Sequence, residues 1–347
     1  MESLLTESAD LPWLTTGRTK LLYGGHKHHC LLIMGPPAIG KYLLALDLAN
    51  RLLCENPAEG GACGSCRACH LVSGSIHPDL HILMPETYDE SDDPTLRNHA
   101  HRYLDTGQSS QKRKPSSQIS VDNARLLSDA LLGTSRIGGR KVALLLAADT
   151  LNRNAANAML KVLEEPVGTT HFILVSSYPY RLPSTIHSRC VRVECQGPSS
   201  KDISTWLRAR HPVQEKQLSA LLLSGLGPIE LDEVLQNEEL KPINALITYC
   251  MGDDHEIPHG LGLAARCANI GLERALTILQ SMALATVRES AKGQTPAAGR
   301  GLFQDVKFSL RAFHKLGLAR ERVRSAVDDQ LALEDICAWM CGGHSQP

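Results

Sequence analysis

Aromatic side chains are scarce in this sequence, at 4% of 347 residues, and neither sign of charge dominates. Lysine and arginine number 36 against 37 aspartates and glutamates, a formal net charge of −1. No global field therefore draws the chain to phosphate backbones or to anionic lipid. A protein that binds nucleic acid through a basic stripe with interleaved aromatic rings is not expected.

Long hydrophobic runs are also lacking. The longest, Val142 to Ala148, is far shorter than the roughly 18 residues that a membrane helix needs, which excludes a membrane-spanning protein. Residues 1 to 10 carry three acidic side chains and no basic cluster followed by an apolar stretch, so they do not resemble a secretory signal. We expect a cytoplasmic protein with no membrane partner.

The chain has enough apolar side chains to fold, with 43% hydrophobic and 21% charged residues. Strand-like runs alternate with helical periods up to about residue 195, which predicts an α/β domain with a parallel sheet covered on both faces. The predicted strands are His29 to Met34, Lys141 to Ala147, His171 to Ser176 and Cys190 to Glu194. From Gly197 onward leucine-rich helical periods dominate, which predicts an all-helical C-terminal part.

These patterns divide the chain into residues 1–195, 196–236 and 237–347, with the polar stretch Gln236 to Lys241 as the linker into the last part. Residues 85–118 are rich in polar and charged side chains and are expected to form a mobile surface insertion without a core. Lys112, Arg113 and Lys114 within it either contact phosphate or are simply solvated.

A glycine-rich turn follows the first predicted strand. Residues 35 to 42, Gly-Pro-Pro-Ala-Ile-Gly-Lys-Tyr, match the phosphate-binding loop (P-loop) pattern except at the last position. In such a loop the backbone N–H groups and the lysine converge on a phosphate, so Gly35, Gly40 and Lys41 are candidate binding residues for ATP or ADP. Tyr42 stands where a serine or threonine hydroxyl normally holds magnesium. The alternative is that the glycines only shape a tight turn.

Hydrolysis of ATP also needs an acidic residue at the end of a neighbouring strand. The strand around Val142 to Ala148 carries none, and Asp149 comes late, in the turn. Asp149 is expected to cap the helix that follows, with a displaced metal ligand as the alternative. The loop is therefore expected to hold a nucleotide at most and to hydrolyse it poorly.

Four of eleven cysteines fall in one window with the spacing C-x8-C-x2-C-x2-C: Cys54, Cys63, Cys66 and Cys69. Four thiolates at these spacings suit a closed, tetrahedral, structural Zn2+ site, and an iron–sulfur cluster is the competing interpretation. A disulfide set is not expected in a reducing compartment. The other seven cysteines are scattered and are expected to be small buried hydrophobes.

Arg189 ends a short predicted helix, Leu182 to Ser188, where the chain returns to the sheet. An arginine there is ordinary on its own, because the helix dipole favours it. The combined pattern, however, resembles the clamp-loader branch of the AAA+ ATPases over most of residues 12 to 195. The matching segments are Gly35 to Lys41, Cys54 to Cys69, His77 to Asp79, Asn157 to Pro166 and Ser188 to Cys190.

The resemblance implies an AAA+ α/β P-loop domain with an inserted zinc module, followed by a small helical lid (196–236) and an all-α collar (237–347). It implies a non-motor, or stator, subunit of the clamp loader of bacterial DNA polymerase III, which loads the sliding clamp onto primed DNA. Arg189 would be an arginine finger that acts in trans on ATP held by a neighbour. The implied partners are the gamma, tau and delta subunits in a hetero-pentameric ring.

Two other functions stay open from the residues alone. One is an active motor subunit that uses Asp149 as its metal ligand, and the other is a zinc-dependent nucleic-acid-binding module with a vestigial P-loop. On the first hypothesis the isolated chain turns over ATP, and on the second it binds DNA tightly. Under the stator hypothesis the chain is an accessory subunit of the polymerase holoenzyme without ATPase activity of its own.

Overall fold

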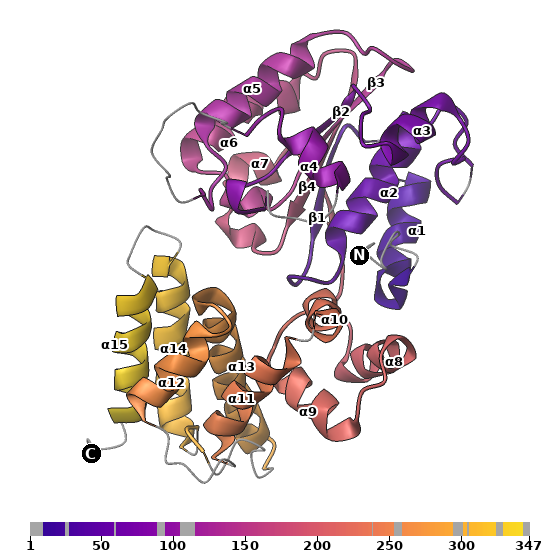
Figure 1. Cartoon of the computed structure of the whole chain (residues 1–347). Coiled ribbons are helices and arrows are strands. Elements are labelled where there is room, and N and C mark those ends of the chain that lie inside the picture. The colour runs from indigo at the N-terminus through magenta and orange to yellow at the C-terminus, as the bar shows by residue number, and fades with distance from the viewer. Residues whose placement is uncertain are drawn as a thin grey trace. The chain divides into compact units, whose positions relative to one another are not determined.

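The computed structural model describes residues 10–24, 28–58, 60–88, 94–104, 115–237, 239–252, 259–293, 301–303, 305–323 and 329–342. The chain divides into two compact units, Met1–Pro198 and Ser199–Pro347 (Figure 1). None of the helices in the described stretches is long and apolar enough to cross a membrane. The sequence division into lid and collar at residue 236 stays a prediction.

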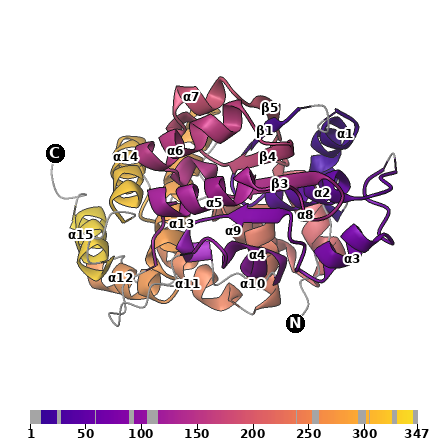
Figure 2. The same cartoon turned by 90° about the horizontal axis from the view of Figure 1, so that it is seen from above.

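The first unit is built on a parallel sheet of five strands in the order β2-β3-β4-β1-β5, as the predicted α/β domain requires. The strands are β1 (Cys30–Met34), β2 (Leu80–Leu83), β3 (Arg140–Leu145), β4 (Thr169–Ser176) and β5 (Val191–Glu194). Figure 2 shows β3, β4, β1 and β5 side by side in this order. Leu32 of β1 pairs with Leu174 of β4. The central strands β1 and β4 are almost wholly buried, whereas β5 is an exposed edge.

Helices cover both faces of this sheet (Figure 1). They are α1 (Thr15–Gly24), α2 (Lys41–Leu53), α3 (Arg67–Ser73), α4 (Pro94–Ala100), α5 (Val121–Leu132), α6 (Arg153–Glu164) and α7 (Ser184–His187). On one face Leu32, Ala143 and Leu174 join the apolar sides of α5 and α6 in one core cluster. Alternate side chains along each strand point to opposite faces, and α2 packs against β1, β3 and β4. The arrangement places the start of α2 at the carboxyl end of β1.

The His77-Pro78-Asp79 turn has a structural role. The buried Asp79 carboxylate accepts hydrogen bonds from the backbone N–H groups of Arg136 (2.8 Å) and Ile137 (2.7 Å). These two amides precede β3, which pairs with β2. One side chain thus holds two neighbouring strands in register at their amino ends.

Part of the polar segment 85–118 differs from the predicted surface insertion without a core. Leu96, Ala100, Tyr103 and Leu104 are all buried, and α4 packs against β2. Leu96 and Ala100 lie at i and i+4 on one face of α4, and Tyr103 and Leu104 lie in the turn that follows the helix. The expectation of a core-less surface insertion was therefore wrong for residues 94–104, because a few buried side chains suffice to dock a short helix and the turn after it. Lys112, Arg113 and Lys114 lie outside the described residues.

Three histidines lie buried around β2: His77, His81 and His99. Burial lowers the pKa of all three, and that of His81 falls to about 4. Burial also raises the pKa of Tyr103 to about 12, and its hydroxyl shares a hydrogen bond with Nδ1 of the His81 ring. Neutral imidazoles are thus part of the folded structure.

We expect acid to destabilise this unit well above the range in which carboxylates titrate. The unfolded state binds protons near pH 6.5 and the folded state does not, so stability is lost as the pH falls from 6.5 toward 4. At pH 5 the His81 shift alone removes about 2 kcal/mol from the free energy of unfolding. Urea unfolding at pH 7 and pH 5 measures the loss. His81→Gln should reduce it, the exposed control His70→Gln should not, and an equal loss in both variants would contradict the assignment.

All the regular secondary structure in the described residues of the second unit is helical, as predicted. Its helices are α8 (Ser200–Arg210), α9 (Glu215–Leu223), α10 (Pro228–Gln236), α11 (Leu240–Met251), α12 (Gly260–Ala268), α13 (Leu272–Ala291), α14 (Val306–Val323) and α15 (Asp329–Gly342). The buried Asp232 carboxylate of α10 accepts from Arg210 (2.9 Å), hydrogen-bonds His211 (2.7 Å) and accepts from Gln236 (2.8 Å). The bonds from Arg210 and His211 to Asp232 link the C-terminal end of α8 to α10.

Candidate functional sites

The glycine-rich turn lies where the sequence pattern requires it, between the end of β1 and the first residue of α2. Gly40 is the N-cap of α2 with φ 90°, in the left-handed region that favours glycine. A Cβ on Gly35 would collide with the backbone carbonyl of Cys195. Both glycines are therefore needed for the path of this turn, whether or not a phosphate binds there.

Lys41 is held inside the turn that it follows. Its Nζ donates to the carbonyl of Pro36 and to Oγ of Ser177 (3.0 Å), and the residue is only 4% exposed. Burial lowers the pKa of Lys41 to about 8. The lysine is thus a buried cation at the amino end of a helix, which is an unfavourable position unless an anion joins it.

We expect Lys41 to lower the stability of the chain at neutral pH. The folded state binds this proton less tightly than the unfolded state, so the penalty is full below pH 8 and fades as the pH rises to 10.5. Lys41→Met should raise the free energy of unfolding at pH 7 by up to about 3 kcal/mol. The gain should shrink between pH 8 and pH 10.5 in urea unfolding curves. Lys20→Met, on an exposed position of α1, is the matched control, and a pH-independent gain would contradict this origin.

The prediction that Asp149 caps the helix that follows it was wrong. It lies in a short 3-10 helix, Ala148–Thr150, and the N-cap of α6 is instead Asn152, whose side chain accepts from the N–H of Ala155 (2.8 Å). Oδ1 of Asp149 accepts from Oγ of Ser176 (2.7 Å) and from the N–H of Ser177 (3.0 Å). The 3-10 helix delays the start of α6, so Asp149 is too early to cap it. Asp149 thus holds the last residue of β4 and the residue after it, Ser177, whose hydroxyl accepts from Lys41.

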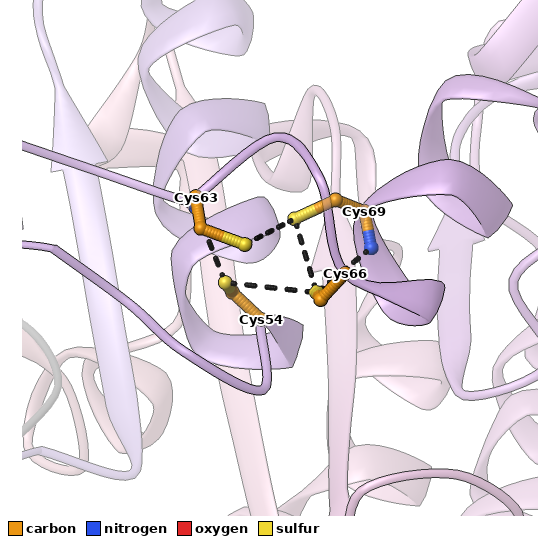
Figure 3. Close-up of side chains that lie close together, drawn as sticks. All are labelled: Cys54, Cys63, Cys66 and Cys69. Atoms are coloured by element: carbon orange, nitrogen blue, oxygen red, sulfur yellow. Dashed lines mark hydrogen bonds between the residues drawn. The ribbon is translucent and has the colours of Figure 1, made fainter.

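The four clustered cysteines converge on one point (Figure 3). Their sulfurs all lie within 4.8 Å of one another, with separations of 3.9 Å for Cys54–Cys66, 3.9 Å for Cys63–Cys69 and 3.4 Å for Cys66–Cys69. A tetrahedron with metal–sulfur bonds of about 2.3 Å has edges of about 3.8 Å. The group therefore fits one metal ion closed by four sulfurs, whereas iron–sulfur clusters spread their thiolates over several irons. Within the described stretches it is the one group with metal-ligand spacing.

Backbone N–H groups point at several of these sulfurs, although burial raises the pKa of the Cys54 and Cys69 thiols. Cys54 directly follows α2, and its Sγ accepts from the N–H of Cys63 (3.2 Å). Cys66 is the N-cap of α3 and accepts from the N–H of Cys69 (3.4 Å). Hydrogen bonds from the N–H groups of Ser65 and Cys66 lower the pKa of the Cys63 thiol to about 6. N–H donors that point at sulfur favour the thiolate, which is the form that binds metal.

Arg189 lies two residues after the end of α7 and two residues before the edge strand β5. Its Nη1 donates to the carbonyl of Thr185 (2.6 Å) and to Oγ of Ser188 (3.2 Å), and its Nη2 pairs with Oε1 of Glu164, the last residue of α6. The side chains are 26% exposed for Arg189 and 48% for Glu164. Sequence reasoning missed Glu164, because a contact across 25 residues leaves no trace in local spacing. The hydrogen-bond partners of Lys41, of Arg189 and of the four cysteines are different residues, so these predicted groups form three separate sites.

Together these features define an α/β protein with a parallel sheet, a phosphate-loop-like turn and a four-cysteine module, joined to a helical unit. The family described as DNA polymerase III, delta subunit, matches residues 19–199, just over half of the chain. The chain is 38% identical over 220 residues to DNA polymerase III subunit delta' of Pseudomonas aeruginosa, covering 63% of this chain and 59% of that protein. It is 32% identical over 253 residues to the delta' subunit of Escherichia coli, covering 72% and 67%. The chain belongs to the delta' family of DNA polymerase III subunits, which confirms the family resemblance.

The chain spans 59% of the length of the Pseudomonas relative. A gamma subunit-related protein of DNA polymerase III from Thermotoga maritima aligns with 94% of this chain and 99% of its own, at a TM-score of 0.49 and 17% identity. A likeness of that size carries no argument about this chain.

Proposed function

We propose that this chain is the non-motor, stator subunit of the DNA polymerase III clamp loader and supplies Arg189 as an arginine finger to a neighbouring ATPase subunit. The family membership carries this proposal. The chain would act in the cytoplasm, in a hetero-pentameric ring with gamma or tau and delta subunits. The ring would use ATP to open the sliding clamp and close it around primed DNA.

The chemistry assigned to Arg189 needs a fixed positive charge with several donors. A guanidinium is always protonated and presents its N–H groups in a planar fork that fits phosphoryl oxygens. Placed against ATP in another subunit, it stabilises the charge that develops on the transferred phosphoryl group. Arg189 lies next to β5, the edge of the sheet, where no further strand of the described fold covers it.

The chain's own phosphate loop is proposed not to turn over ATP. The ammonium of Lys41 is bonded within the loop, and Tyr42 replaces the hydroxyl that would hold magnesium. Oδ1 of Asp149 already accepts hydrogen bonds from the end of β4, which weighs against its use as a displaced metal ligand in an active motor. The site would bind ATP or ADP at most.

The four-cysteine group is proposed to hold a structural Zn2+ ion. Cys54, Cys63, Cys66 and Cys69 would be its ligands and would leave no position open for catalysis. Zinc would cross-link the end of α2 to the start of α3. Its part is to stabilise the fold around the helix that begins at Lys41.

Mixing the full chain with gamma or tau and delta subunits tests the proposed function. Native mass spectrometry should show the chain in the complex, and its addition should raise ATP turnover, whereas the chain alone should turn over none. Steady ATP hydrolysis by the isolated chain would favour the motor alternative. Tight, salt-sensitive DNA binding by the lone chain without assembly would favour the nucleic-acid-binding alternative.

A further inference from the structure

We propose that Glu164 binds the Arg189 guanidinium when no nucleotide contacts it. Glu164 then competes for the guanidinium with the phosphate of the ATP that the neighbouring subunit holds. The finger is then withheld in the resting state and released when nucleotide on the neighbour replaces the carboxylate. This inference rests on the proposed function of Arg189. It adds a residue that controls when the finger is available.

A count of the guanidinium donors supports a withheld state. Two N–H groups of Nη1 are used by Thr185 and Ser188, and one of Nη2 by Glu164. Two N–H groups remain, one of Nη2 and that of Nε, and Nε is buried and has no partner. A bidentate contact to phosphate needs two neighbouring donors that both reach the ligand. With Nε buried, Arg189 in this arrangement presents one accessible donor and not a fork to another subunit.

The position of Glu164 explains why the pair forms. Glu164 is the last residue of α6 and Glu165 is its C-cap, so two carboxylates lie at the negative end of the helix dipole. A cation placed there relieves this repulsion. The carboxylate and a phosphoryl group also offer the same chemistry, because both accept the planar guanidinium fork through oxygens. Glu164 is thus a substitute for the anion that the finger is proposed to meet.

Exposure makes the pair reversible. Both side chains contact solvent, at 26% for Arg189 and 48% for Glu164, so breaking the pair buries no uncompensated charge. Ion pairs of this kind change an equilibrium by about two- to fivefold. That factor is enough to alter a resting rate and small enough for a triphosphate to overcome.

The lone chain offers a test that does not depend on activity. Phenylglyoxal modifies accessible guanidinium groups, and the modified peptide can be followed by mass spectrometry. Glu164→Gln should make modification of Arg189 about two- to fivefold faster, whereas the control Asp129→Asn, on an exposed position of α5, should leave it unchanged. An unchanged rate in Glu164→Gln would mean that the pair does not restrain the arginine in solution and would overturn the inference.

The reconstituted complex tests the functional part. Glu164→Gln should raise the resting ATPase about two- to fivefold and leave the rate with clamp and primed DNA at the wild-type value, and the control Asp129→Asn should change neither. On an Arg189→Ala background the Glu164 change should have no effect. If both rates fall or neither changes while Arg189→Ala still lowers turnover, the inference fails alone. If Arg189→Ala itself has no effect, the proposed function fails.

Discussion

Replacing Arg189 with alanine is expected to slow ATP turnover at the neighbouring subunit's site about 10³-fold or more, the range found for arginine fingers supplied in trans. The variant loses the fixed charge and the donors that would stabilise the transition state. Its fold should be intact, because the ion pair that it breaks is partly exposed and such pairs contribute about 0–1 kcal/mol. The effect should therefore appear in the complex and not in the chain alone.

The measurement is the DNA-stimulated ATPase of the reconstituted complex, which should fall by the share that this one site contributes. Arg189→Lys should recover little, because lysine keeps the charge and loses the fork. Arg192→Ala, three residues further on an exposed position of β5, is the matched control. A normal rate in a complex that contains Arg189→Ala would contradict the assigned role.

Loss of one cysteine ligand is expected to remove the metal and to disorder the zinc module. Structural zinc sites contribute about 10–16 kcal/mol of binding free energy that is also folding free energy. Cys66→Ser should reduce the zinc content from one ion per chain to almost none. Hydrogen exchange should accelerate by several orders of magnitude across residues 54–73, while the second unit should exchange as before.

Metal analysis and exchange mass spectrometry measure both effects. Cys341→Ser, in α15 and outside the cluster, is the control and should retain the zinc. Iron in place of zinc would support the iron–sulfur alternative. A fully metallated Cys66→Ser protein with unchanged exchange would show that the four sulfurs do not form the site.

β1, β3 and β4 could be predicted because each contains a run of apolar residues long enough to stand out. β5 has only the alternation Val-Arg-Val-Glu, which is typical of an edge strand. β2 was missed because its short apolar run is interrupted by His81, a polar side chain that is buried beside Tyr103. α4 was missed for a related reason. The composition of residues 85–118 is polar on average, and an average conceals the few side chains that are buried, Leu96 and Ala100 in α4 and Tyr103 and Leu104 just after it.

The candidate sites were likewise predictable only where their residues lie close together in the sequence. The cysteine cluster and the glycine-rich turn are local in sequence, so their spacing predicts them. The contacts that decide how charged residues act join distant segments: Lys41 with Ser177, Asp149 with Ser176, and Arg189 with Glu164. Asp149 was assigned to the wrong partner because a turn between it and α6 changes where the helix begins, which residue types alone do not encode.

The structure of the assembled complex with a non-hydrolysable ATP analogue tests the central claim most directly. We predict that the guanidinium of Arg189 has left Glu164 and lies within hydrogen-bond distance of the terminal phosphate in the neighbouring subunit. An Arg189 side chain that stays on Glu164, remote from every bound nucleotide of a complex that hydrolyses ATP normally, would contradict it.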